Sequence, residues 1–382
     1  MNNYPNDYNN QYNQNTPNRP GYPNNQYNPY YQYNQNYQYN PYQYNGANPY
    51  QQQQYNEQLR RQMYNSMLRR NEIKQLISDG VIIGATILVY LIVQVIIVSL
   101  LQGSKYYSVY ESSSTFQNCF NVIAVHLMSM AIPFSVMALI LKKRFTGPLI
   151  PTQKLPFSGL CAWVALGMGG CMLANIITNG IIKLFDFGGY KLTQPELLKP
   201  DNIIALLATL VSTAVIPAIF EEYAMRCCTL GALRKYGKGF AVVAVSIVFG
   251  LIHGNLIQFI FAFLVGAVLG YITVRTDNII PAILIHGFNN GISVLGDFIT
   301  YFSSSKTADN VETYIVLLWA LFAVAALVYL LANHELLPKK EQNAPQKPYK
   351  INFGIKLLCL APGFFVPFTI LAFITSQYIQ HK

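Results

Sequence analysis

Five histidines and a pair of adjacent glutamates stand in a chain that is otherwise poor in charge. Glu221 and Glu222 directly follow Ala-Ile-Phe, and His253 and His286 each lie within an apolar run. An ionisable group at bilayer depth costs at least ~2.5–3.5 kcal/mol and is a functional-site hypothesis by default. We therefore expect the chemistry of this protein at these residues.

Two of these sites have a further polar residue four positions later in the sequence, which places it on the same helix face. Glu222 and Arg226 are i and i+4 on a helix, and an ion pair between them would reduce the cost of burying both. Glu221 points about 100° away from that pair, which leaves its carboxylate free for chemistry. His286 and Asn290 are also i and i+4, so an imidazole and an amide share one helix face.

This set of side chains suits the hydrolysis of an amide in two ways, and the sequence leaves both open. Glu221 can take a proton from water that His253 helps to hold, while His286 and Asn290 donate hydrogen bonds to the oxyanion. Equally, Glu221, His253 and His286 form the His₂Glu set of a catalytic zinc site, although the HExxH spacing is absent. A third reading is a buried polar network that only fixes helix packing.

The elements that must position these residues are transmembrane helices. The chain is 52% hydrophobic and only 11% charged, which excludes an ordinary soluble enzyme. Apolar stretches of this kind predict an all-α, polytopic bundle of about eight to nine spans. The candidate crossings are 81–101, 118–141, 157–182, 203–233, 240–253, 256–274, 279–299, 314–333 and 355–379, of which the fifth is the shortest.

The predicted helices place the three polar groups at similar depth. Counted from the cytoplasmic end of its helix, Glu221 lies about 20 Å deep, His253 about 22 Å and His286 about 14 Å, at 1.5 Å per residue. Each is better tolerated if all three face one cavity inside the bundle. His126, in the middle of the second span, is interpreted as a packing or hydrogen-bonding residue outside the site.

The orientation follows from the distribution of Lys and Arg, which favours cytoplasmic loops. With the N-terminus in the cytoplasm, 17 of these residues fall on the inner side and 6 on the outer side. The sequence therefore predicts a multi-pass protein of the cell membrane with a cytoplasmic N-terminus. The net charge of +10 is explained by this asymmetry and by the anionic lipid bilayer, and no nucleic-acid partner is expected.

The ends of the chain differ from the bundle. Residues 1–58 are rich in Asn, Gln and Tyr and have no aliphatic face, which predicts a disordered cytoplasmic tail, with binding of protein partners as the alternative role. Residues 59–80 predict a basic juxtamembrane helix. Residues 81–335 would form the helical core, and residues 336–382 a cytoplasmic loop with an extra C-terminal span.

At the polar residues the sequence resembles the CPBP family, the intramembrane proteases related to the type II CAAX prenyl endopeptidase and to bacteriocin-processing or immunity proteins. The family pattern is Glu-Glu-x-x-x-Arg, Phe-x-x-x-His and His-x-x-x-Asn, each on its own helix. Here the motifs read EEYAMR (221–226), FGLIH (249–253) and HGFNN (286–290). The resemblance covers roughly residues 203–297.

The resemblance implies an intramembrane endopeptidase that hydrolyses a membrane-associated or lipidated peptide or protein. Members are called metalloproteases by convention, yet a metal-free glutamate mechanism is also held for the family, so Zn²⁺ and no metal both stay open. The alternative function is a non-proteolytic peptide-binding or bacteriocin-immunity protein. The implied active residues are Glu221, His253, His286 and Asn290, with Glu222 and Arg226 as structural support.

Overall fold

The computed structural model describes residues 48–195, 198–336 and 348–381, and the chain divides by its internal contacts into the units 1–62 and 63–382. The predicted disordered tail falls mostly outside the described residues. Its last part does not fit that prediction, because helix α2 (Pro49–Gln102) already includes residues 49–58. The four glutamines at 51–54 are good helix formers, and Asn48 Oδ1 accepts a hydrogen bond from the backbone N–H of Tyr50 at 3.1 Å.

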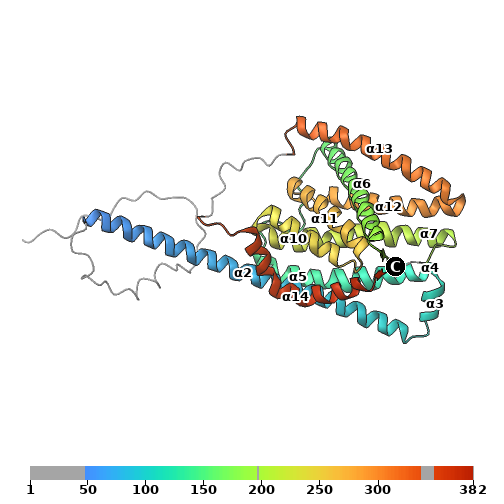
Figure 1. Ribbon diagram of the computed structural model, residues 1–382, viewed down its shortest axis with the longest axis horizontal. Coiled ribbons are helices and arrows are strands. Elements are labelled where there is room, and N and C mark those ends of the chain that lie inside the picture. Colours follow the sequence, from blue (N-terminus) through green and yellow to red (C-terminus); the bar gives the residue numbers. More distant parts are fainter. Residues whose placement is uncertain (1–47, 196–197, 337–347, 382) are drawn as a thin grey trace, which may run out of the picture. The chain divides into compact units, whose positions relative to one another are not determined.

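The described part of the chain is almost entirely helical (Figure 1). Three stretches, η1, η3 and η4, are π-helical turns that interrupt longer α-helices. After α2, the elements in chain order are α3 (Tyr107–Ser112), α4 (Ser114–Asn121), η1 (Val122–Ala131), α5 (Ile132–Leu141), η2 (Lys142–Arg144), α6 (Phe157–Phe187), β1 (Tyr190–Leu192), α7 (Ile203–Thr209), η3 (Leu210–Val215), α8 (Ile216–Glu222), η4 (Tyr223–Leu230), α9 (Gly231–Leu233), η5 (Arg234–Tyr236), α10 (Lys238–Leu251), α11 (Leu256–Thr276), α12 (Ile280–Phe302), α13 (Ser305–Ala332), α14 (Phe353–Ser376) and β2 (Ile379–His381).

The predicted polytopic bundle is confirmed, with a smaller number of clear spans. Seven helical stretches of the described residues are long and apolar enough to cross a membrane, against nine predicted crossings. The fifth predicted crossing is α10, whose 14 residues reach about 21 Å, short of the ~30 Å hydrocarbon core. The seventh is α12, which is long enough but carries His286, Asn289 and Asn290 in place of apolar side chains.

A β-bridge, an ion pair and a two-stranded sheet show which loops lie together on each of two faces of the bundle. Residues 152 and 278 form an isolated antiparallel bridge, and Arg234 pairs with Asp277 at 2.9 Å, so the loops at 142–156, 234–237 and 277–279 lie together. On another face β1 pairs with β2, which joins the loop at 188–202 to the C-terminal strand. The first group contains three of the predicted cytoplasmic loops, and the second contains two of the predicted outer segments.

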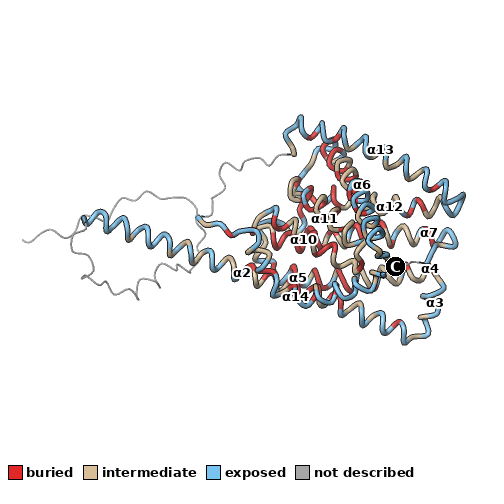
Figure 2. Tube along the Cα trace, in the orientation of Figure 1, coloured by how far each residue is buried: buried red, intermediate tan, exposed pale blue. Residues whose placement is uncertain are grey.

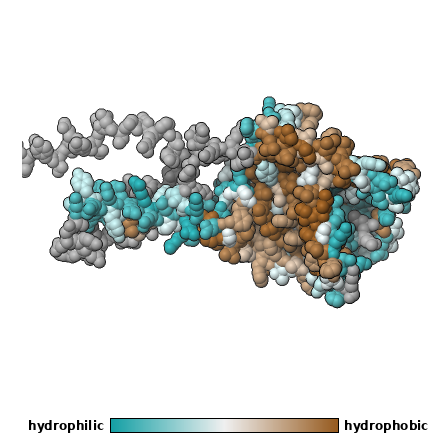
Figure 3. Space-filling view, turned by 45° about the horizontal axis from the view of Figure 1, so that its top comes forward, coloured by the Kyte–Doolittle hydropathy of each residue, from teal (hydrophilic) through white to brown (hydrophobic). Residues whose placement is uncertain are grey.

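The bundle buries a core and leaves an apolar exterior. Buried residues line the helix–helix contacts (Figure 2), and Figure 3 shows a broad hydrophobic band across the helices of the unit 63–382. Large apolar side chains such as Leu139, Leu317 and Phe365 are exposed, as expected where helices face lipid. Helix α12 packs against η3 and α8, which brings the third sequence motif onto the first, and α10, which leads into the second motif, packs against η4.

Candidate active site inside the helix bundle

Three separate elements carry the polar residues of the sequence motifs. Glu221 and Glu222 end α8, which begins with Pro217 at its first turn and is flanked on both sides by the π-helical η3 and η4. His253 lies in the turn between α10 and α11, where Gly254 adopts a positive φ of 70°. His286 lies in the first half of α12. π-Helical turns are frequent at functional sites, because the wider turn re-aims side chains.

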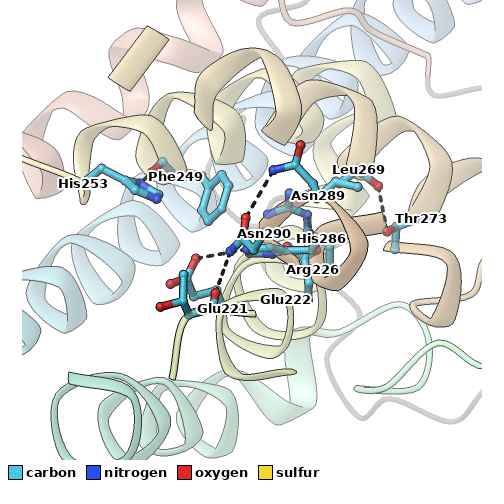
Figure 4. Close-up of polar contacts among 11 residues, drawn as sticks. Glu221, Glu222, Arg226, Phe249, His253, Leu269, Thr273, His286, Asn289 and Asn290 are labelled. Carbon is cyan, nitrogen blue, oxygen red and sulfur yellow. Dashed lines mark hydrogen bonds and ion pairs between the residues drawn. The ribbon is translucent and has the colours of Figure 1, made fainter. Parts of the chain in front are cut away.

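Glu222 is the centre of a buried polar network (Figure 4). Its side chain is fully buried, and its two oxygens have different partners: Oε2 lies 3.0 Å from Arg226 Nε and Oε1 lies 2.9 Å from His286 Nδ1. The expected i,i+4 pair with Arg226 is therefore present. The Arg226 guanidinium also lies over the ring of Phe249, 4.8 Å from its centroid, a cation–π contact.

The contact between Glu222 and His286 fixes which ring nitrogen faces the site. A carboxylate can only accept, so His286 Nδ1–H donates to Glu222 and Nε2 is left on the other side. That Nε2 lies 3.9 Å from Oε2 of Glu221, whose side chain keeps 14% of its surface exposed. Glu221 and His286 therefore meet at one point, with Glu221 available for chemistry.

His253 is oriented by the backbone of its own turn. Its Nδ1 lies 2.7 Å from the carbonyl oxygen of Phe249, which can only accept, so Nδ1–H donates and Nε2 is the acceptor nitrogen of the neutral ring. The Phe249 ring makes edge contacts with both imidazoles, at 5.0 Å to His253 and 6.0 Å to His286. The two histidines thus flank one aromatic ring (Figure 4).

Asn290 is held by two hydrogen bonds. Its Nδ2 donates to the carbonyl oxygen of Thr213 in η3 at 2.9 Å, and its Oδ1 accepts from Asn289 Nδ2 at 3.2 Å. The first bond uses one of the two N–H groups of the amide, and the second N–H remains to serve a ligand. The bond to Thr213 ties the middle of α12 to η3.

The four residues expected to be active line a single cavity of about 790 Å³. They are Glu221, His253, His286 and Asn290. The cavity is also lined by His126, contrary to the sequence-based interpretation of that residue as lying outside the site. His126 is buried, and its Nδ1 has no hydrogen-bond partner among the described residues. A single ionisable residue in the middle of a span was the signal that could have placed it here.

The proposed His₂Glu zinc ligands do not assemble into a metal site in this arrangement. No group of three or more His, Cys, Asp or Glu in the described ranges has the geometry to hold an ion. The Nδ1 atoms of His253 and His286 are engaged by Phe249 and Glu222, and Phe249 stands between the two imidazoles. These contacts leave the Nε2 atoms of both histidines available, which is the usual orientation of a metal-ligating histidine. No step below is routed through a metal.

Comparison with models of known protein families finds one family that this chain resembles. Residues 203–292 match the family model described as type II CAAX prenyl endopeptidase Rce1-like. This segment is similar to Rce1-like domains. The match covers less than half of the chain, includes α8 and the first part of α12, and confirms the resemblance to the CPBP family of intramembrane proteases. Searches of curated proteins and of solved structures gave no significant match.

Proposed function

We propose that the protein is an intramembrane endopeptidase in which Glu221 activates water for attack on a peptide bond. The observation that carries the proposal is the pairing of a partly exposed Glu221 with His286, whose other nitrogen is held by the buried Glu222. Two adjacent glutamates thus take different roles because one is fully buried in an ion pair and the other faces the cavity. The Rce1-like domain supports an endopeptidase of the CAAX type in general.

The steps follow from the hydrogen-bonding roles of these side chains. The unprotonated Nε2 of His253 accepts a hydrogen bond from the attacking water, and the Glu221 carboxylate takes its proton as the oxygen bonds to the carbonyl carbon. The free N–H of Asn290 and a proton on His286 Nε2 then donate to the oxyanion. The C–N bond breaks, the proton held by Glu221 passes to the leaving nitrogen, and the products are a carboxylic acid and an amine.

The donor role of His286 sets a condition on its protonation. Nδ1–H is already committed to Glu222, so donation from Nε2 requires that the ring carries both protons. Asn290 has no such requirement, because its amide donates at any pH. Substitutions at His286 and at Asn290 can therefore measure separately what each donor contributes to stabilising the oxyanion.

The protein would act in the cell membrane with its N-terminus in the cytoplasm. The loops that the Thr152–Asn278 bridge and the Arg234–Asp277 pair hold together are the Lys- and Arg-rich ones, which supports the assignment of that face to the cytoplasm. The substrate would be a membrane-associated or lipidated polypeptide. The N-terminal tail could bind protein partners there.

The alternative function is binding of a peptide in the same cavity without hydrolysis, as in an immunity protein. The two are separated by incubating the purified full-length protein with a peptide library and detecting new termini by mass spectrometry. Glu221→Gln should abolish cleavage while Glu111→Gln, on the exposed helix α3, leaves it unchanged. Binding without new termini in the wild type would support the alternative.

A further inference from the structure

The wall of the cavity is built from one half of each helix. On α6 the lining residues Asn175 and Asn179 lie in the half that runs towards β1, away from the basic loop at 142–156. Asn118 lies near the start of the helical stretch that ends at the basic loop 142–156. Ser212 likewise lies in the first part of the stretch that ends at the basic loop 234–237. Each helix thus contributes the part that is remote from the Lys- and Arg-rich face.

The exposed end of the cavity lies on that remote side. Deep in the cavity His286 is buried, whereas several lining side chains are exposed and form its rim. None of the described residues of the basic loops at 142–156, 234–237 and 277–279 lines the cavity. One rim residue belongs to the loop that follows β1, which pairs with the C-terminal strand β2. The rim residues are Asn175, Asn179, Gln194, Gln258 and Ser293.

The chemistry of the rim is that of neutral amides. Four of its five members are carboxamides, and each offers both an N–H donor and a C=O acceptor, the same pair that every residue of an extended peptide backbone offers in return. The hydrogen bond from Asn179 Nδ2 to Asn175 Oδ1, at 3.1 Å, leaves further donor and acceptor capacity on both. A rim of this kind recognises the backbone of a polypeptide rather than a charged end group.

The charged residues that line the cavity limit the charge that a substrate can carry. The described lining residues include Glu221 and Glu312 but no Lys or Arg. A free α-carboxylate or a phosphate would meet no Lys or Arg along the described wall of the cavity, and His286 lies buried at its base. Entry of such a group past the rim is therefore unfavourable for a charge removed from water. A neutral or basic internal segment meets no such penalty.

We infer that the substrate enters from the face opposite the basic loops, as an extended, uncharged or basic internal segment of an unlipidated polypeptide at the membrane surface. Of the two substrate classes proposed above, this favours the membrane-associated over the lipidated one. This inference rests on the proposed endopeptidase activity and on the proposed cytoplasmic position of the basic loops, which together make it the outer face. The carboxamide rim pairs with the peptide backbone, and the scissile bond reaches Glu221 below it. A lipid-modified cytoplasmic C-terminus is not the substrate that this entrance fits.

Accessibility of single cysteines tests the entrance. In a full-length background in which the exposed Cys119 and Cys161 are serine, Gln194→Cys should react with a membrane-impermeant maleimide added to intact cells. The matched variant Lys154→Cys, exposed on a basic loop, should react only after permeabilisation. Labelling of Gln194→Cys only after permeabilisation would overturn the inference.

Measurements of cleavage separate a failure of the proposed entrance from a failure of the proposed endopeptidase activity. A bulky adduct on Asn179→Cys should abolish cleavage of an externally added, unlipidated basic peptide, while an adduct on Lys154→Cys should not. Ser293→Cys provides a second rim position should the first variant fold poorly. If cleavage persists with both rim adducts, or only a prenylated peptide is cut, the entrance is wrong although the enzyme is real. If Glu221→Gln cleaves as well as wild type, the proposed function itself fails.

Discussion

Replacing Glu222 by glutamine perturbs the buried network at its centre. The variant keeps the size of the side chain and an oxygen that can accept from His286, but it removes the negative charge that lies 3.0 Å from Arg226. Both side chains of this ion pair are fully buried, so no water replaces the lost partner. Attraction between unit charges at this separation is about 5 kcal/mol at an effective dielectric constant of about 20.

The net destabilisation is smaller than the attraction, because the pair was itself costly to bury. Breaking a buried ion pair by removing one partner typically costs about 3–5 kcal/mol. Because glutamine keeps the hydrogen bond to His286, we expect the lower end, a loss of about 3 kcal/mol in the free energy of unfolding. Arg226→Met should cost a similar amount, since it leaves the Glu222 carboxylate buried beside His286 alone.

The double variant Glu222→Gln with Arg226→Met separates charge pairing from simple loss of packing. It buries no unpaired charge, so its unfolding free energy should lie well above that expected from the sum of the single losses. Reversible unfolding in mixed detergent micelles, followed by circular dichroism, measures all four members of the cycle. Additive losses, or a Glu222→Gln variant within about 0.5 kcal/mol of wild type, would refute the reasoning.

Three further predictions concern the oxyanion donor, the metal and the helix packing. Asn290→Asp keeps the shape of the side chain but loses both N–H donors, including the one to Thr213. We therefore expect kcat to fall by about 10²–10³-fold with little change in KM. An unchanged kcat would show that Asn290 does not stabilise the oxyanion. Incubation with a zinc chelator should leave the cleavage rate unchanged, because the candidate ligands do not assemble; loss of activity that added Zn²⁺ restores would contradict this. Gly84→Ala should lower the thermal unfolding midpoint strongly, because its Cβ would overlap the backbone oxygen of Gly363 on α14, whereas Gly180→Ala, with nothing within 4 Å, should have little effect. Equal midpoints for the two glycine variants would disprove that contact.

Much of the fold was predictable, because lipid imposes a simple rule on sequence. Backbone groups in the bilayer must be paired within a helix, so long uncharged runs such as 314–333 predict their helices directly. The rule is weaker where polar residues interrupt a run, as at Asn289 and Asn290 in α12, or where a run is short. Gly254 and Asn255, which caps α11 by accepting from the N–H of Gln258 at 2.9 Å, end α10 early.

The site was predictable in its residue types and less so in its contacts. The i,i+4 spacing gives the pair of Glu222 and Arg226, because both lie on one helix. The bond from His286 to Glu222 spans 64 positions and depends on how α12 packs against α8, which no local pattern encodes. His126 and Thr213 lie in π-helical turns, where side chains depart from the i,i+4 pattern of an α-helix, so the position of His126 on the cavity wall could not be read from spacing.

The central claim is that Glu221 is the base of a hydrolytic reaction, and the rate of cleavage of one defined peptide tests it most directly. With purified full-length protein, Glu221→Gln should lower kcat/KM by about 10²–10⁴-fold, the usual contribution of a general base, with the fold retained by circular dichroism. Glu111→Gln should cleave at the wild-type rate. A folded Glu221→Gln variant that cleaves the same peptide as fast as wild type would contradict the account.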